Sequence, residues 1–240
     1  MRKIAILISC SLLLSCDQLL PLLESAGSSL KTPATKYEVS SGIKEALTVG
    51  IKNTVFKTSA NNGFLSNSLI KIPFPQEAAK VESTVRNLGL GSKVDEFVAT
   101  LNHGAEEASK KATPIFVNAI TAMSINDVYN IWRGDNNAAT EYLKGATQSQ
   151  LTTAFSPVIK SALKKVDVTK YWDPLINTYN KIPLVQKMNP NLEEYVLDKT
   201  LEGLFKMLAL EEAKIREDPA ARVSDLLKKV FGYQGVSSFQ

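Results

Sequence analysis

NLEEYVLDKTLEGLFKMLALEEAKIRE, residues 191–217, is the longest helical pattern in the sequence. Its apolar residues recur at intervals of three or four, which is the period of one face of an α-helix. They are Val196, Leu197, Leu201, Leu204, Phe205 and Leu208. Asn191, three residues before Glu194, is a typical signal for a helix N-terminus. The pattern therefore predicts one helix over about 192–217.

The same period continues through most of the sequence from residue 40 onward. Cap residues and glycine or proline stops divide this region into further helices. We expect them to begin at Ser40 or Ser41, Gln76, Ser92, Thr113, Ser124 and Asp218, with two more over 137–146 and 149–166. Pro157 is expected to kink or break the helix over 149–166. The sequence predicts an all-α multi-helix bundle of roughly eight to ten helices, with little or no β structure.

The N-terminal segment has the layout of a secretory signal peptide. Met1-Arg2-Lys3 is positively charged, and the uncharged stretch from Ile4 to Leu14 is too short to span a bilayer, which takes about 20 apolar residues. Leu13-Leu14-Ser15-Cys16 then resembles a bacterial lipobox, in which the cysteine is lipidated and becomes the new N-terminus. We predict a signal peptide over 1–15, a lipidated N-terminus and tether over 16–40, a single helical domain over 41–232 and a C-terminal tail over 233–240.

Charge and cysteine content limit which partners and which reactive or metal sites this chain is expected to have. The formal net charge of +4 falls by two when Arg2 and Lys3 are removed with the leader, and no basic run alternates with aromatic residues. We therefore expect no nucleic-acid partner. Removal of Cys10 and lipidation of Cys16 would leave no thiol in the mature chain. Disulfides, thiolate zinc sites and cysteine nucleophiles are excluded on this basis, and we expect no metal and no cofactor.

Three neighbouring residues are the candidates for a ligand or polar site. Asn102 and Glu106 lie four residues apart on one helix face, and His103, the only histidine in the chain, lies between them. A single histidine without cysteines does not make a nitrogen-rich metal site. No Gly-x-Ser-x-Gly motif accompanies it, and Gly89-Leu90-Gly91 follows a helix, so we interpret this segment as a helix stop. Glu211-Glu212 is a second acidic candidate.

An ordered set of short motifs extends over about residues 40–232. It comprises Gly63-Phe64-Leu65, Ile72-Pro73-Phe74-Pro75, Leu88-Gly89-Leu90-Gly91, Leu101-Asn102 with Ala105-Glu106, Pro114-Ile115-Phe116, Met123-Ser124-Ile125, Gly134, Ala138-Ala139-Thr140, Gly203-Leu204-Phe205, Glu211-Glu212 and Leu226–Gly232. As a set, these motifs resemble the bacterial envelope family DUF4197, a domain of unknown function. The resemblance implies a predominantly helical exported domain, often behind a lipoprotein leader, and it carries no activity.

We expect a lipid-anchored protein of the cell envelope that faces the periplasm and acts as a helical binding or scaffold module. Its partners would be the membrane, through Cys16, and an envelope protein or hydrophobic ligand. Asp17 resembles the signal that retains enteric lipoproteins in the inner membrane, and the choice of membrane stays open. Two alternatives remain: a carrier of a lipid or other hydrophobic ligand in a bundle cavity, and a carboxylate-based hydrolase that uses Asn102, His103 or Glu106. No catalytic motif was found, so we do not expect an enzyme.

Overall fold

The computed structural model describes residues 34–164 and 191–232, together with Trp172, Asn177, Asn180, Lys181 and Lys187. The α-helices in these ranges are α2 (Lys36–Thr58), α3 (Ala79–Val85), α4 (Gly91–Ser109), α5 (Ala112–Ala122), α6 (Ile125–Arg133), α7 (Ala138–Lys164), α9 (Leu192–Glu217) and α10 (Asp225–Gly232). Short helical turns are η2 (Gln76–Ala78), η3 (Arg86–Leu90) and η4 (Pro219–Ala221). The described ranges contain no strand, which confirms the all-α prediction.

Seven of these helices have eight residues or more, slightly fewer than the eight to ten expected for the whole chain. The predicted signal peptide, Cys16 and the C-terminal tail lie outside the described residues. None of the helices in the described ranges is both long enough and apolar enough to cross a bilayer.

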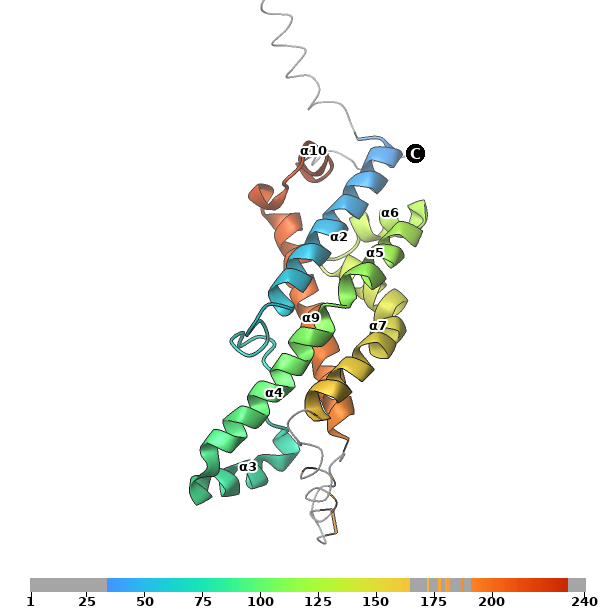
Figure 1. Ribbon diagram of the computed structural model, residues 1–240. Helices are drawn as coiled ribbons and strands as arrows, with labels where there is room; N and C mark the ends of the chain where they lie inside the picture. The colour runs from blue at the N-terminus through green and yellow to red at the C-terminus, as the bar shows by residue number, and fades with distance from the viewer. Residues whose placement is uncertain are drawn as a thin grey trace, which may run out of the picture.

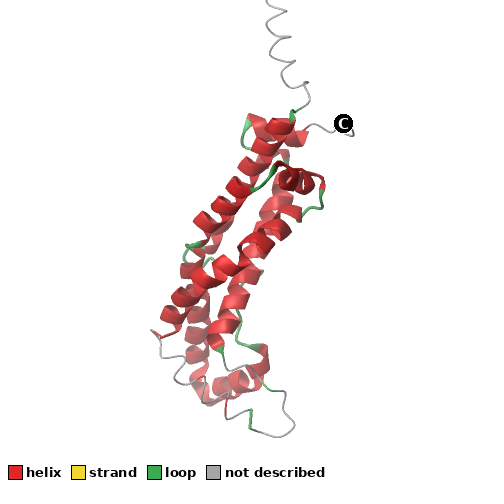
Figure 2. Cartoon of the chain, turned by 90° about the vertical axis from the view of Figure 1, so that its right-hand side faces the viewer, coloured by secondary structure: helices red, strands yellow, loops and turns green. Residues whose placement is uncertain are grey.

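The helices form an elongated bundle whose long axis is followed by α2, α4, α7 and α9 (Figures 1 and 2). Helix α9 packs against α2, α4 and α7, so it is the central element of the bundle. The start of α2 and helix α10 lie at one end of the molecule, and α3 with the start of α4 lies at the other (Figure 1).

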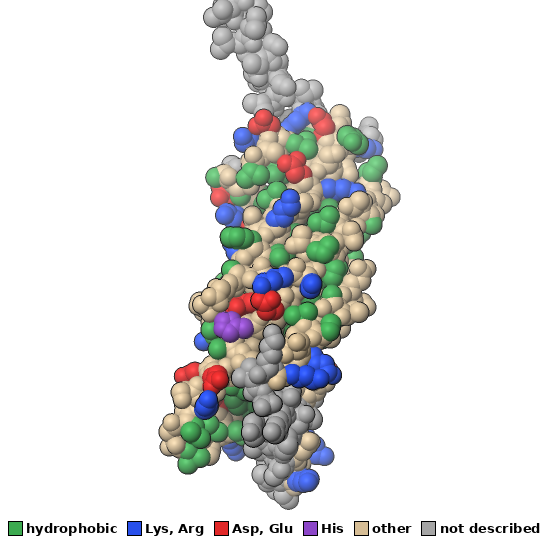
Figure 3. All heavy atoms as spheres, in the orientation of Figure 1, with side chains coloured by type: hydrophobic (Ala, Val, Ile, Leu, Met, Phe, Trp, Pro, Cys, Tyr) green, Lys and Arg blue, Asp and Glu red, His purple; other side chains and the backbone are tan. Residues whose placement is uncertain are grey.

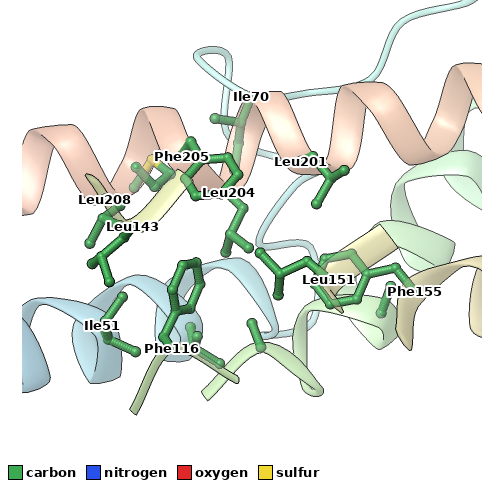
Figure 4. Packing of buried hydrophobic residues seen from close by; sticks show 14 of the residues in the cluster. Ile51, Ile70, Phe116, Leu143, Leu151, Phe155, Leu201, Leu204, Phe205 and Leu208 are labelled. Carbon is green, nitrogen blue, oxygen red and sulfur yellow. The ribbon is translucent and has the colours of Figure 1, made fainter. Parts of the chain in front are cut away.

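The apolar face predicted for α9 forms much of the core. Leu201, Leu204, Phe205 and Leu208 are buried, and Figure 4 shows them facing Phe116 and other side chains from neighbouring helices. The Phe205 and Phe116 rings meet edge to face, with centroids 5.8 Å apart. This geometry is favourable for aromatic pairs beyond the area that they bury.

The first helix begins earlier than predicted. We expected the tether to extend to residue 40, but α2 starts at Lys36 with Thr35 as its cap. The Thr35 hydroxyl accepts a hydrogen bond from the Glu38 N–H (3.2 Å), and the Glu38 carboxylate accepts one from the Thr35 N–H (2.8 Å). This capping box satisfies two N–H groups that are otherwise unpaired at the helix start. Glu38 also pairs with Lys229 of α10. This ion pair and the hydrogen bonds with Thr35 together lower the pKa of Glu38 to about 2.

The two helices expected over 137–146 and 149–166 are one continuous helix, α7, with Pro157 inside it. Every fourth residue of α7 is buried along a single stripe, namely Leu143, Thr147, Leu151, Phe155, Ile159 and Leu163. Thr147 fits this stripe because its hydroxyl donates to the Leu143 carbonyl oxygen (2.6 Å). Burial along the whole stripe outweighs the backbone hydrogen bond that Pro157 cannot make.

The segment over 59–75, between α2 and η2, is irregular but closely packed. Phe64, Ile70 and Ile72 are buried, and Asn62 adopts a positive φ of 61°. Phe64 and Ile70 rest on α9 at Gly203, where an added Cβ would lie 2.8 Å from the Phe64 ring and 3.1 Å from the Ile70 Cβ. The close approach of this segment to α9 therefore requires a glycine at position 203.

Gly203→Ala is predicted to lower the free energy of unfolding by about 1–2 kcal/mol, because the new methyl group overpacks a buried contact and this outweighs the better helix propensity of alanine. Gly145→Ala on α7 is the matched control, since a Cβ there meets nothing within 4 Å. It should raise the free energy of unfolding by about 0.5–1 kcal/mol. Urea denaturation of both variants checks the prediction, and equal shifts would show that the contact at Gly203 is not tight.

Candidate functional site

Asn102, His103 and Glu106 lie on successive turns of α4, and the structure brings them together against the segment over 59–75. Asn102 and Glu106 are buried, whereas the His103 side chain is 46% exposed. Figure 3 shows the histidine side chain, in purple, on the molecular surface beside acidic side chains. The roles of these residues follow from their hydrogen bonds.

Asn102 holds the backbone of Ile72. Its side-chain amide donates to the Ile72 carbonyl oxygen (2.8 Å), and its side-chain oxygen accepts from the Ile72 N–H (2.8 Å). The amide also donates to the Val98 carbonyl oxygen within α4 (2.7 Å). The Asn102 side chain thus satisfies both backbone groups of a buried residue that has no strand partner.

Glu106 holds the preceding part of the same segment. One carboxylate oxygen accepts from the N–H groups of Phe64 (3.1 Å) and Leu65 (3.2 Å). The other accepts from the Asn62 N–H (3.2 Å) and contacts His103 Nδ1 (2.8 Å). A buried carboxylate requires such partners, because burial without them is costly. Both oxygens of Glu106 are therefore engaged in positioning the loop.

The two residues of the second acidic candidate, Glu211-Glu212, are neighbours on α9 but contact two different helices. Glu212 accepts hydrogen bonds from the N–H groups of Ala139 (3.0 Å) and Thr140 (2.8 Å), so a side chain from α9 caps the N-terminus of α7. Arg216 pairs with the same carboxylate at 2.9 Å. Glu211 instead contacts Lys57 and Asn53 of α2. Among the described residues, no group of three histidine, cysteine or acidic side chains is arranged to hold a metal ion.

A hollow of about 220 Å³ lies between the segment over 69–77 and one face of α9. We call it the lysine hollow. One wall contains Leu69, Ile70, Lys71, Pro73, Gln76 and Glu77, and the other contains Tyr195, Lys199, Glu202, Gly203 and Lys206. The residues on α9 follow one another at helical spacing, so they form a single stripe along that helix.

Tyr195 links the two walls of the lysine hollow. Its hydroxyl donates to the Pro73 carbonyl oxygen (3.1 Å). Burial, together with the charges of Glu77 and Glu202, raises the pKa of Tyr195 to about 12. The phenol therefore stays protonated at neutral pH and remains a hydrogen-bond donor.

A wider hollow of about 550 Å³ lies on the other side of the same segment, between α3 and α4. We call it the α3–α4 hollow. It shares Lys71, Pro73 and Gln76 with the lysine hollow and has a largely apolar lining that includes Phe74 and Val98. Arg86 spans its rim by pairing with Glu82 (2.9 Å) and Asp95 (3.0 Å). No residue of α3 is buried, so this helix is an exposed wall of the hollow.

Sequence reasoning selected Asn102, His103 and Glu106 as candidates for a ligand or polar site, but it missed the two hollows. Their walls come from residues far apart in the chain, such as Lys71 and Lys206, and no local motif joins them. One signal was present: Tyr195, Lys199, Gly203 and Lys206 mark a polar stripe with a glycine along a helix whose other face is apolar.

The sequence matches the family described as "Protein of unknown function (DUF4197)" over residues 33–232. The chain therefore belongs to this family. No curated protein and no solved structure matches it. The predicted resemblance is confirmed, and the family's description assigns no activity to the hollows.

Glu106→Gln is predicted to lower the free energy of unfolding by about 1–3 kcal/mol, because an amide offers one acceptor oxygen where the carboxylate offers two, and its NH2 group would face backbone donors. Glu107→Gln is the neighbouring control. Glu107 is exposed, and its one ion pair among the described residues is with Lys110, directly after the end of α4, so its replacement should change stability by less than about 0.5 kcal/mol. Chemical denaturation at neutral pH measures both, and a Glu106→Gln protein as stable as the control would contradict the assigned role.

Proposed function

We propose that this DUF4197 member is a lipid-anchored cell-envelope protein whose helical body faces the periplasm and acts as a binding module. The observation that carries the binding role is the pair of hollows on the two sides of the segment over 71–76. Two buried polar side chains, Asn102 and Glu106, hold the segment that forms the shared wall. Surface concavities on a rigid support are the usual form of a binding site.

The packing of the interior favours this function over a carrier with a ligand inside the bundle. One hollow reaches between α2, α6, α7, α9 and α10, and it holds about 20 Å³, which is about the volume of one water-sized probe. A lipid chain would need a cavity of several hundred Å³. The lysine hollow and the α3–α4 hollow are both larger and lie at the surface, so we propose that ligand binding occurs there.

The hydrogen bonds of α4 favour binding over hydrolysis. The hydrolase alternative needs Asn102, His103 or Glu106 to face a cleft together with other polar groups. The Asn102 amide and both Glu106 oxygens instead bond to the protein's own backbone. None of the three residues lines either of the two hollows.

The proposed anchor rests on the leader and Cys16 of the sequence. Each buried CH2 group of an acyl chain contributes about 0.8 kcal/mol to membrane binding, so two or three chains on one cysteine hold a protein stably. The residues that line the hollows belong to α3, α4, the first half of α9 and the segment before α3. Helix α3 and the starts of α4 and α9 lie in the half of the bundle away from the start of α2 (Figure 1). We call the surface that contains the two hollows the binding face. In this proposal it points away from the anchored end.

The anchor is tested with Cys16→Ser. We expect this variant to lose palmitate labelling and to leave the membrane fraction, because the substituted side chain offers no thiol for acylation. Metabolic labelling and cell fractionation measure both effects. A variant that stays labelled and membrane-bound would show that Cys16 is not the anchor.

The binding face is tested by site-specific photo-crosslinking in intact cells. A photoreactive phenylalanine replaces Leu69, which lines the lysine hollow and is 52% exposed. The matched control replaces Leu210 on α9, which is 46% exposed and lines neither hollow. We expect irradiation to give a discrete adduct from position 69 and none from position 210. The same pattern at both positions, or no adduct at position 69, would refute the proposed face.

A further inference from the structure

From its charges and shape, we infer that the lysine hollow binds a phosphate group. This inference rests on the proposed binding function and names the chemistry that one part of the binding face recognises. Three ammonium groups, Lys71, Lys199 and Lys206, line the hollow together with two carboxylates, Glu77 and Glu202. The arrangement of these five charges decides which ligand fits.

Two of the three lysines in the hollow are available to bind an anion. Lys199 Nζ lies 2.7 Å from a Glu202 carboxylate oxygen, and this pair on one helix neutralises both side chains. The side-chain ammonium groups of Lys71 and Lys206 form no hydrogen bond or ion pair with any other residue in the described ranges. They come from opposite walls, so an anion between the walls would meet positive charge from two directions.

Glu77 limits where the anion lies. Its carboxylate is on the wall near Tyr195, where its charge helps to raise the pKa of that phenol. An anion beside Glu77 would be repelled. The favourable position is therefore between Lys71 and Lys206, and Gln76 supplies an uncharged amide donor on the same wall as Lys71.

The kind of cation favours phosphate over carboxylate. An arginine fork matches the plane of a carboxylate, but the lining of this hollow contains only lysines as cations. A lysine ammonium acts as a point charge and binds phosphate oxygens from any direction. A volume of about 220 Å³ admits a phosphate with a small substituent. Both a free phosphate ester and the headgroup of a phospholipid carry this chemistry.

The wall geometry supports a preformed site. Gly203 brings the segment over 69–77 against α9, and the hydrogen bond from Tyr195 to Pro73 holds the same two elements together. Lys71 and Lys206 are thus carried by two packed elements, so the ligand orders the two side chains but not the backbone that carries them. Because both side chains are exposed, their attraction to an anion is screened by salt.

The test uses the full chain in detergent and isothermal titration calorimetry with inorganic phosphate. We expect binding that weakens as salt is added and that falls at least tenfold in the double variant Lys71→Gln/Lys206→Gln. Lys144→Gln, an exposed lysine on α7 outside both hollows, should leave the affinity unchanged. Circular dichroism should show equal melting temperatures for all three proteins, because the substituted side chains are exposed.

Short-chain phosphatidic acid, compared with short-chain phosphatidylcholine, separates the two sources of the phosphate. Phosphatidic acid binding at least tenfold tighter than inorganic phosphate would identify a lipid headgroup, and equal affinity would identify a free phosphate ester. The inference is overturned if neither phosphate source binds the full chain, or if the double variant binds as tightly as the unchanged protein. An adduct at position 69 in a chain that binds no phosphate would preserve the binding face and reject only this ligand.

Discussion

The irregular segment between α2 and η2 is held to the bundle by hydrogen bonds from two side chains of α4, and the binding face depends on them. Asn102 pairs with both backbone groups of Ile72, and Glu106 accepts from three N–H groups between Asn62 and Leu65. A segment without regular structure has backbone groups that must be paired elsewhere when they are buried. These two side chains supply the partners, and the apolar side chains of the segment then complete the core between α4 and α9.

The same solution recurs at the other end of the bundle. Glu212 of α9 accepts from the first N–H groups of α7, and Arg216 balances its charge within one turn. Helix N-termini favour a negative charge because their N–H groups are unpaired and the helix dipole is positive there. In both places a buried carboxylate joins two elements of the fold. Glu106 and Glu212 are therefore buried as acceptors for backbone N–H groups that the helices themselves do not pair.

Much of the fold could be predicted from the sequence, because helical period and cap residues are local signals. The apolar face of α9 and the cap at Ser124 followed directly from them, and the Ser124–Asp127 capping box is present. The start of α2 at Lys36 was missed, although Thr35 and Glu38 have capping-box spacing. The continuity of α7 depends on burial against other helices, and no local rule outweighs a proline in its interior. The hollows are also formed by residues that are far apart in the chain. Only the wall on α9 has a recognisable local pattern in the sequence, because its residues share one helix face.

The position of Gly203 connects packing to the proposed binding chemistry. A helix interior is a poor place for glycine, since alanine is favoured there by about 1 kcal/mol. Here the missing side chain lets Phe64 and Ile70 touch α9, and this contact sets the distance between the two walls of the lysine hollow. A ligand that bridges Lys71 and Lys206 would bind the closed arrangement of these walls and not a chain in which the segment is detached. Such a ligand would add its binding free energy to the contact that Gly203 makes possible. The glycine thus serves the core and the binding face through one and the same contact.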